Sequence, residues 1–533
     1  MTKVFLLLLI RLGHRGTSNH LRYKRVASKR TIFRARGTYE TARSSKFMKK
    51  FSKILLIMAA AYCLLLIPFP QNESDPKKAS QTPFLWDQDA LWKQLEDAFL
   101  KAKEMPPGEL DSIIQVLTTQ TDSILSVFED KTLQPDDGHY ASIQNRFFQV
   151  APLIAAQQNK SDWHIRFYNR VRKKLKTDAL HWDMNQPAAR TLSYRILYGM
   201  RAAVEEILLQ SSEAQFVSTM FVADEASATP AATIMGIKVH SGDLLVSRGG
   251  AEVSAFISRG NDFPGNFSHV ALVYVSEETN EPSLVEAHIE KGVAIATLEA
   301  YLKDKKLRFM VMRPRADLEA LRANPMLPHE AAFFMYKEAQ DRHIPYDFKM
   351  DYYDASAMFC SEVGSFAYKQ FGVQLWEFTS TISSNGIMDW LHSFGVENFV
   401  TQMPSDLEYD PTLSVVAEWR DKETLFQDHL DNAVMDALIE RANAGEKLDY
   451  NGWLLPIARV LKGYSFLQTT LGKEGIIPEG MSAVTALKNN DFVARFQHLK
   501  SLTESKIDGF VEENKYVPPY WQLVRFAEES IVE

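Results

Sequence analysis

One cysteine stands where a thiol could act as a nucleophile. Cys360 is one of only two cysteines in the chain, and the other, Cys63, lies in an apolar segment near the N-terminus. Apolar residues follow Cys360 at helical spacing as far as Phe371, and Gly372 is a plausible helix end. Cys360 therefore falls in the first turn of a predicted helix, where unpaired amides and the helix dipole stabilise a thiolate. A buried structural cysteine is the alternative, and the commoner fate of an isolated one.

A thiol nucleophile needs a base to accept its proton. His269 interrupts the apolar run from Phe267 to Val275, which has the pattern of a strand. The imidazole is either a core histidine with satisfied hydrogen bonds or the base. On the next predicted strand, Glu286 and His288 share one face. A carboxylate there can accept the imidazole N–H and fix its orientation, although Glu286 could equally be a solvated edge residue.

Metal binding is the rival use of the same side chains. His269, Glu286, His288 and Cys360 are all potential ligands, but the chain contains no H-E-x-x-H sequence and no paired C-x-x-C. Two cysteines also exclude a disulfide scaffold and a cysteine-rich zinc site. We expect the chemistry to need side chains alone, with no cofactor.

Five short apolar or β-branched runs, bounded by turn residues, carry His269 and Glu286 and their surroundings. Strands at this spacing predict a largely antiparallel sheet. A predicted helix from Pro328 to Asp341 and then the Cys360 helix follow, which makes the region α+β. The runs are residues 242–248, 267–275, 283–289, 292–297 and 307–312.

Helical patterns flank this region on both sides. Apolar residues recur at helical spacing from residue 87, and again from about Trp376 to the end. We therefore expect a helical domain over residues 87–225, an α+β domain over 237–375 and a helical C-terminal region over 376–533. The N-terminal helical domain shows no catalytic cluster, and packing on its neighbour or covering it is the expected role.

The segment over residues 48–70 has the pattern of a signal peptide or a short signal anchor. It begins with the basic stretch Met48–Lys53 and continues with the apolar run Ile54–Phe69. The run is shorter than a comfortable transmembrane helix and no clean cleavage site follows it, so a cleaved leader and an anchor both stay open. We expect an exported protein of the periplasm or cell envelope, either free or anchored to the inner membrane through residues 54–69.

The N-terminus is basic and the rest of the chain is acidic. Met1–Lys53 holds fifteen Lys or Arg and one acidic residue, Glu40, a net charge of +14 that leaves −21 for the remainder. An acidic body argues against nucleic acid as a partner. Residues 1–47 have no pattern of a folded domain, which makes Met48 a candidate start. Residues 71–86 have the composition of a linker.

Five short motifs follow one another between residues 237 and 375. In this order they resemble the permuted papain-like cysteine hydrolases of the NlpC superfamily, in particular the YaeF/YiiX-type amidase branch. Circular permutation in that family places the histidine strand before the nucleophile helix, and the order His, Glu, Cys agrees. The stretch from Glu408 to Trp419 also resembles that branch. The motifs are Gly242-Asp243-Leu-Leu, Ser268-His269-Val-Ala, Val285-Glu286-Ala287 with Gly292-Val293, Tyr346-Asp347-Phe348 and Phe359-Cys360-Ser361-Glu362-Val363.

The resemblance implies a role for each candidate residue. Cys360 would be the nucleophile, His269 the general base and then acid, and Glu286 the orienting residue. His288 could replace Glu286, because some permuted relatives use another polar residue there. The backbone N–H of Cys360 would help to bind the oxyanion. The implied reaction is hydrolysis of an amide or ester through an acyl-enzyme.

Three functions follow from the resemblance and the predicted export. Hydrolysis of the peptide part of cell-wall murein is the first. A lipid amidase, esterase or acyltransferase of the same fold is the second, and an apolar groove beside Cys360 would favour it. A catalytically silent envelope binding module is the third, and an unreactive Cys360 would favour it. The large flanking helical regions are not part of the family's minimal core, so they could regulate, block or redirect the site.

Overall fold

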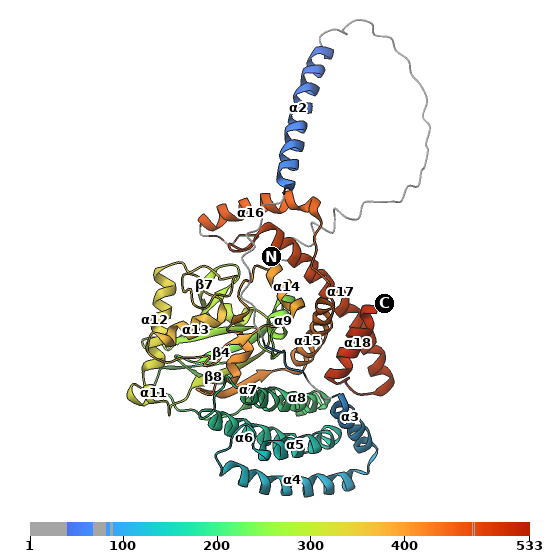
Figure 1. Ribbon diagram of the computed structural model, residues 1–533, viewed down its shortest axis with the longest axis vertical. Coiled ribbons are helices and arrows are strands. Elements are labelled where there is room, and N and C mark those ends of the chain that lie inside the picture. Colours follow the sequence, from blue (N-terminus) through green and yellow to red (C-terminus); the bar gives the residue numbers. More distant parts are fainter. Residues whose placement is uncertain (1–39, 68–80, 86–88, 472, 474, 533) are drawn as a thin grey trace. The chain divides into compact units, whose positions relative to one another are not determined.

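The computed structural model describes residues 40–67, 81–85, 89–471, 473 and 475–532 (Figure 1). The chain divides into two compact units, residues 1–64 and residues 65–533. Helix α2 (Glu40–Leu66) contains the described part of the predicted signal segment 48–70. Within the described ranges, no helix is both long enough and apolar enough to cross a membrane. The signal peptide or anchor stays a prediction, and most of the predicted extension 1–47 and linker 71–86 lies outside the described residues.

Helices form the N-terminal part of the second unit, as the sequence predicts from residue 87. Their apolar faces meet in one core, to which Phe128, Phe147 and Tyr168 contribute fully buried rings. Tyr409 and Leu425 from the far end of the chain join this core, so the helices pack on their neighbour. The helices are α3 (Asp89–Glu104), α4 (Pro107–Glu129), α5 (Gly138–Gln157), α6 (Ser161–Ala179), α7 (Pro187–Tyr194), the π-helical η1 (Arg195–Met200) and α8 (Arg201–Gln210).

A seven-stranded sheet follows in the order β1-β11-β8-β4-β5-β6-β7. Each neighbouring pair is antiparallel, so the predicted α+β class with a largely antiparallel sheet is confirmed. Five of these strands coincide with the five predicted runs. The strands are β1 (Thr219–Phe221), β4 (Leu244–Gly249), β5 (His269–Val275), β6 (Pro282–His288), β7 (Gly292–Thr297), β8 (Lys306–Pro314) and β11 (Leu413–Arg420), with β2 (Ala231–Ile234) and β3 (Ile237–His240) forming a separate hairpin.

Strand β11 lies within residues 376–533, for which the sequence pattern predicts a helical region, and it belongs to the sheet. It pairs with β1 on one side and β8 on the other, so the sheet extends well beyond residue 375. The run is almost entirely buried, and its register shifts between Val415 and Ala417. The register shift breaks the alternation of inward and outward residues that identifies a half-buried strand, and the polar residues Glu418 and Arg420 interrupt the apolar run that is typical of a strand covered on both faces. The short strand β1 was missed within the predicted helical domain 87–225.

Helices pack on the sheet and also form a separate core in the C-terminal region. Val363 and Ala367 of α13 pack with Leu244 and Val246 of β4, which fixes the Cys360 helix against one face of the sheet. A separate core joins α9 with α14, α15, α17 and α18. The remaining elements are α9 (Glu252–Arg259), α10 (Leu298–Lys303), α11 (Glu319–Ala323), α12 (Leu327–Asp341), α13 (Cys360–Lys369), α14 (Asn385–Ser393), α15 (Lys422–Asn443), α16 (Leu455–Thr470), α17 (Ala483–Asn514) and α18 (Tyr520–Val532), with the short β9 (Ser380–Thr381), β10 (Val400–Thr401), η2 (Glu213–Gln215), η3 (Pro404–Tyr409) and η4 (Gly452–Leu454).

Gly292 begins β7 with a positive φ of 73° and no room for a side chain. A Cβ there would lie 2.1 Å from the main-chain oxygen of Ile344, which accepts a hydrogen bond from Val293 N–H. Gly372 has a similar φ of 77° and open space around it. We expect Gly372→Ala to lower the free energy of unfolding by about 1–2 kcal/mol through backbone strain alone. Gly292→Ala should cost about 1–3 kcal/mol more, because the backbone must move. Equal losses in urea unfolding would contradict the close approach.

Candidate active site

Cys360 is the first residue of α13 and is buried. The preceding Phe359 is extended, and its backbone N–H donates to Glu362 Oε2 at 2.8 Å. This contact is one half of a capping box and holds the start of the helix in place. The amides of the first turn lack acceptors within the helix, so the N–H of Cys360 is available where its side chain would react.

His269 is the first residue of β5 and lies next to this helix start. The Cys360 thiol lies 3.9 Å from the main-chain oxygen of Ser268, the residue that precedes the histidine. Ser268 N–H in turn donates to Ser247 on β4 at 2.9 Å, which continues the pairing of β4 with β5. The sheet therefore fixes the histidine backbone, and α13 brings the thiol to it.

Glu286 on β6 joins two imidazoles. Its Oε2 lies 2.6 Å from His269 Nε2, and its Oε1 lies 2.9 Å from Nε2 of His288. The carboxylate is buried, whereas both histidine side chains keep some exposure, 20% and 26%. Since Nε2 of His269 is held by the carboxylate, Nδ1 is the nitrogen that remains for the thiol. The structure thus brings His269, Glu286 and Cys360 together, with His288 as a second partner of Glu286.

The electrostatics of the site suit a charged imidazole. Burial lowers the pKa of His269, but hydrogen bonds and charge interactions with Cys360 and Glu286 outweigh burial and raise it to about 9. Burial raises the pKa of Glu286, yet the hydrogen bonds and charges of His269 and His288 hold it well below its usual range. At neutral pH, Glu286 is therefore a carboxylate, and the raised pKa of His269 allows its imidazole to retain a proton accepted from the thiol.

The His269 pair predicts how stability depends on pH. The pKa of His269 rises from an ordinary 6.5 to about 9 in the folded protein, so its stabilisation is complete below pH 6.5 and is lost as the pH rises through 9. We expect the free energy of unfolding of the wild type, relative to His269→Ala, to fall by up to about 3 kcal/mol between pH 6 and pH 10. Urea denaturation measures this difference.

His343→Ala is the control for that measurement. His343 pairs with Glu479 at 3.0 Å, but both side chains are about half exposed. Solvent screens such a pair, and we expect it to contribute less than about 1 kcal/mol. If the wild type and His269→Ala lose stability in parallel across the whole range, the charged pair is refuted.

Two residues near the thiol, Glu362 and Tyr346, have no role predicted from the sequence. Burial, together with the negative groups around it, raises the pKa of Glu362 to about 9, although its hydrogen bond from Phe359 acts the other way. A neutral Glu362 avoids a second negative charge beside a Cys360 thiolate. Burial and the charge of Cys360 keep the pKa of Tyr346 well above its usual range. A glutamate three residues after a helix N-cap is a recognisable capping pattern and could have been found from sequence.

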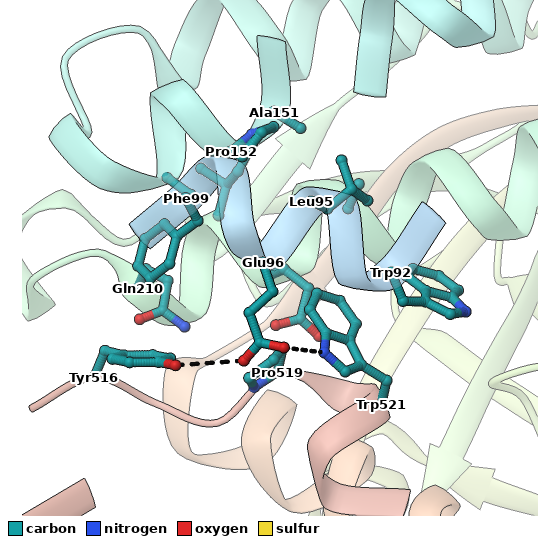
Figure 2. A pocket seen from close by; sticks show the side chains of 14 residues that line it. Trp92, Leu95, Glu96, Phe99, Ala151, Pro152, Gln210, Tyr516, Pro519 and Trp521 are labelled. Atoms are coloured by element: carbon teal, nitrogen blue, oxygen red, sulfur yellow. Dashed lines mark hydrogen bonds between the residues drawn. The ribbon is translucent and has the colours of Figure 1, made fainter. Parts of the chain in front are cut away.

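No group of three His, Cys, Asp or Glu side chains in the described ranges is arranged to hold a metal ion. An apolar pocket is formed elsewhere in the fold, by α3, α5, α8 and the segment leading into α18 (Figure 2). There Glu96 accepts hydrogen bonds from the Tyr516 hydroxyl at 3.3 Å and from Trp521 Nε1 at 3.0 Å. None of the residues that line it belongs to the site around Cys360. This pocket is therefore not the groove that a lipid substrate would need beside the thiol.

Comparison with known proteins gives one family and one solved structure. Residues 238–417 match the family described as permuted papain-like amidase enzyme, YaeF/YiiX, C92 family. The matched range includes most of β11. The crystal structure of the metalloprotein YiiX from Escherichia coli O157:H7 is 18% identical, and the match covers 34% of this chain and 97% of that chain with a TM-score of 0.27. The search of curated proteins gave no match.

Proposed function

Residues 238–417 form a permuted papain-like amidase domain of the YaeF/YiiX C92 family, and from this premise we propose that the protein is a cysteine hydrolase that cleaves an amide or ester bond. Cys360 is the nucleophile, His269 the base and Glu286 the residue that orients it. The observation that carries the proposal is the hydrogen bond of 2.6 Å between His269 Nε2 and Glu286 Oε2, next to a thiol that shifts the pKa of the same imidazole.

The reaction begins with transfer of the Cys360 proton to His269. The thiolate attacks the carbonyl carbon, and the resulting oxyanion accepts a hydrogen bond from the backbone N–H of Cys360 at the helix start. The C–N or C–O bond then breaks, and the imidazolium of His269 returns its proton to the leaving amine or alcohol. Water, deprotonated by His269, attacks the thioester, releases the acid and restores the thiol.

Glu286 and His288 act in series in this proposal. Glu286 binds Nε2 of His269 directly, so it selects the tautomer and stabilises the imidazolium. Nε2 of His288 lies 2.9 Å from the other carboxylate oxygen and positions Glu286. His288 is therefore a positioning residue and not a substitute for Glu286.

We propose an amide of the cell envelope, such as the murein peptide, as the substrate. The support is the basic segment and apolar run over residues 48–69, which are typical of exported proteins. A lipid amide or ester is the second candidate, because the exposed apolar stripe described below would bring the site to a lipid surface.

An activated ester tests the chemistry without knowledge of the substrate. Incubation of the full chain with p-nitrophenyl acetate should give a burst of nitrophenolate and a mass increase of one acetyl group on the peptide that contains Cys360. Cys63→Ala should keep the adduct and Cys360→Ala should lose it. An adduct that Cys360→Ala leaves unchanged, or no adduct at all, would favour the binding module. A panel of murein peptides and N-acyl lipids would then separate the two substrates.

A further inference from the structure

Helix α16 exposes a row of large apolar side chains. They begin at Trp453 in η4, continue along α16 and end at Leu471 just after it, at alternating spacings of four and three residues. At about 100° per residue, this spacing places the side chains within α16 along one side of the helix. Each is between 46% and 75% exposed, whereas Leu455, Ala458 and Ser465 on the opposite face are buried. A contiguous apolar row of this length marks an interaction surface, unlike a single exposed residue. This row, the α16 stripe, consists of Trp453, Ile457, Val460, Tyr464, Leu467 and Leu471.

Within the segment that carries the stripe the charged residues are all basic, with Asp449 before the segment and Glu474 after it. Between Tyr450 and Lys473 the chain carries Arg459, Lys462 and Lys473 and no acidic residue, in a protein whose net charge is −7. A helix with an apolar face, aromatic residues and basic side chains is suited to an anionic lipid surface. Trp453 and Tyr464 are the residue types that favour the interface between lipid headgroups and acyl chains.

The position of α16 in the second unit agrees with this partner. Arg459 donates to the main-chain oxygens of Leu65 and Ile67, both at 2.7 Å. These residues belong to the end of the apolar run 54–69 that predicts a leader or anchor. Arg459 therefore binds the backbone at the end of the apolar run that predicts a leader or anchor.

We propose that the α16 stripe binds an anionic membrane surface, with α16 lying parallel to the bilayer plane. The apolar side chains enter the boundary between headgroups and acyl chains. The positive charges of Lys473, Arg459 and Lys462 attract the lipid phosphates. This surface is separate from the run 54–69, because α16 lies on the surface and does not span the bilayer.

The same helix is connected to the site. Lys462 of α16 donates to the main-chain oxygens of Pro478 and Glu479, both at 2.6 Å. Next in the chain, Gly480 packs so closely on the Phe348 ring that a Cβ would lie 2.4 Å from it. The Phe348 ring contacts the ring of Tyr346. The charge of Cys360 is one of the causes that raise the pKa of Tyr346. If Cys360 is the nucleophile as proposed, docking through α16 holds this thiol close to substrates on the membrane surface. The docking itself does not depend on that function.

Tryptophan quenching by brominated lipid tests the docking directly. The full chain is mixed with vesicles of phosphatidylglycerol and phosphatidylcholine whose acyl chains carry bromine, which quenches only rings that touch them. We expect a quenched component that Trp453→Phe removes and that is reduced several-fold in Val460→Asp/Leu467→Asp. No tryptophan lies within residues 54–69, so that run adds no tryptophan signal of its own. Val460→Asp/Leu467→Asp leaves the run unchanged and therefore reports the contribution of the stripe.

The matched control carries the same change on another helix. Val116 and Val127 of α4 are 55% and 53% exposed, and Val116→Asp/Val127→Asp should leave the quenching unchanged. Equal quenching in the two double variants would overturn the proposal, as would equal quenching by vesicles of phosphatidylcholine alone. A dimer that α16 substitution dissociates, seen by light scattering without lipid quenching of Trp453, would assign the stripe to a second copy of the chain instead.

Discussion

Cys360→Ala is expected to abolish hydrolysis of every amide or ester that the protein accepts, a loss on the order of 10⁴-fold or more. In the proposed mechanism the sulfur of Cys360 forms the covalent bond with the substrate, and alanine offers no replacement. Glu286→Gln should retain the nucleophile but lower kcat by on the order of 10²–10⁴-fold, because a neutral amide lacks the negative charge that stabilises the imidazolium. Steady-state kinetics on p-nitrophenyl esters measure both changes.

His288→Ala and Cys63→Ala are the controls for these two variants. His288→Ala leaves the bond of 2.6 Å between His269 and Glu286 intact and should lower kcat by less than Glu286→Gln does. Cys63 is exposed and lies in α2, and its replacement should leave the rate unchanged. Turnover that survives Cys360→Ala, or a larger loss in His288→Ala than in Glu286→Gln, would contradict the assigned roles.

Arg308→Met is expected to lower the free energy of unfolding by about 3–5 kcal/mol. Arg308 on β8 is buried and binds Glu205 of α8 at 2.6 Å and 3.1 Å and Asp428 of α15 at 2.6 Å. Methionine would leave two buried carboxylates without this cation. The three partners come from the N-terminal helices, the sheet and the C-terminal helices, so the loss should separate regions that the native protein holds together.

An exposed pair provides the control for Arg308. Lys349 lies 3.2 Å from Glu397, but the lysine side chain is 64% exposed, and Lys349→Ala should cost less than about 1 kcal/mol. The double variant Arg308→Met/Glu205→Gln should recover part of the loss, because it removes one of the two buried carboxylates that lose Arg308 as a partner. If urea denaturation gives Arg308→Met the small cost of Lys349→Ala, the pairs do not link the regions.

Two further ion pairs connect the N-terminal helices to β11 and to the region that matches the amidase family. Arg172 of α6 pairs with Glu418 of β11, and Arg201 of α8 pairs with Glu408 in the short helix before that strand. All four side chains are buried. An ion pair of this kind is costly unless both partners are held, so the contact requires a fixed arrangement of helices and sheet.

The local elements of the site could be predicted because short-range patterns determine them. Alternation placed His269 and Glu286 on strands, and the apolar spacing after Cys360 placed the thiol in the first turn of α13. These signals depend on neighbours within a few residues. The order of the motifs along the chain then allowed the family to be identified, and the match over residues 238–417 confirms it.

Features set by distant partners could not be predicted in the same way. Strand β11 is buried on both faces and lacks the alternation of an exposed strand, so its place between β1 and β8 depends on residues a hundred or more positions away. The role of His288 could not be predicted either. Its contact with the second oxygen of Glu286 depends on the direction of two side chains on one strand, and the sequence pattern left Glu286 and His288 as alternatives for the third residue.

The most direct test of the account compares the two cysteines of one chain. Cys63 is exposed and Cys360 is buried, so exposure alone would make Cys63 the faster of the two to react with iodoacetamide. The proposed pair of Cys360 and His269 predicts the reverse at about pH 6.5, because the histidine would accept the thiol proton and the thiolate is the species that reacts. Peptide mapping after brief labelling should find the label on Cys360 first, and His269→Ala should move it to Cys63. Labelling of Cys63 first at every pH, with a Cys360 rate indifferent to His269→Ala, would contradict the thiol–imidazole pair and with it the proposed hydrolase.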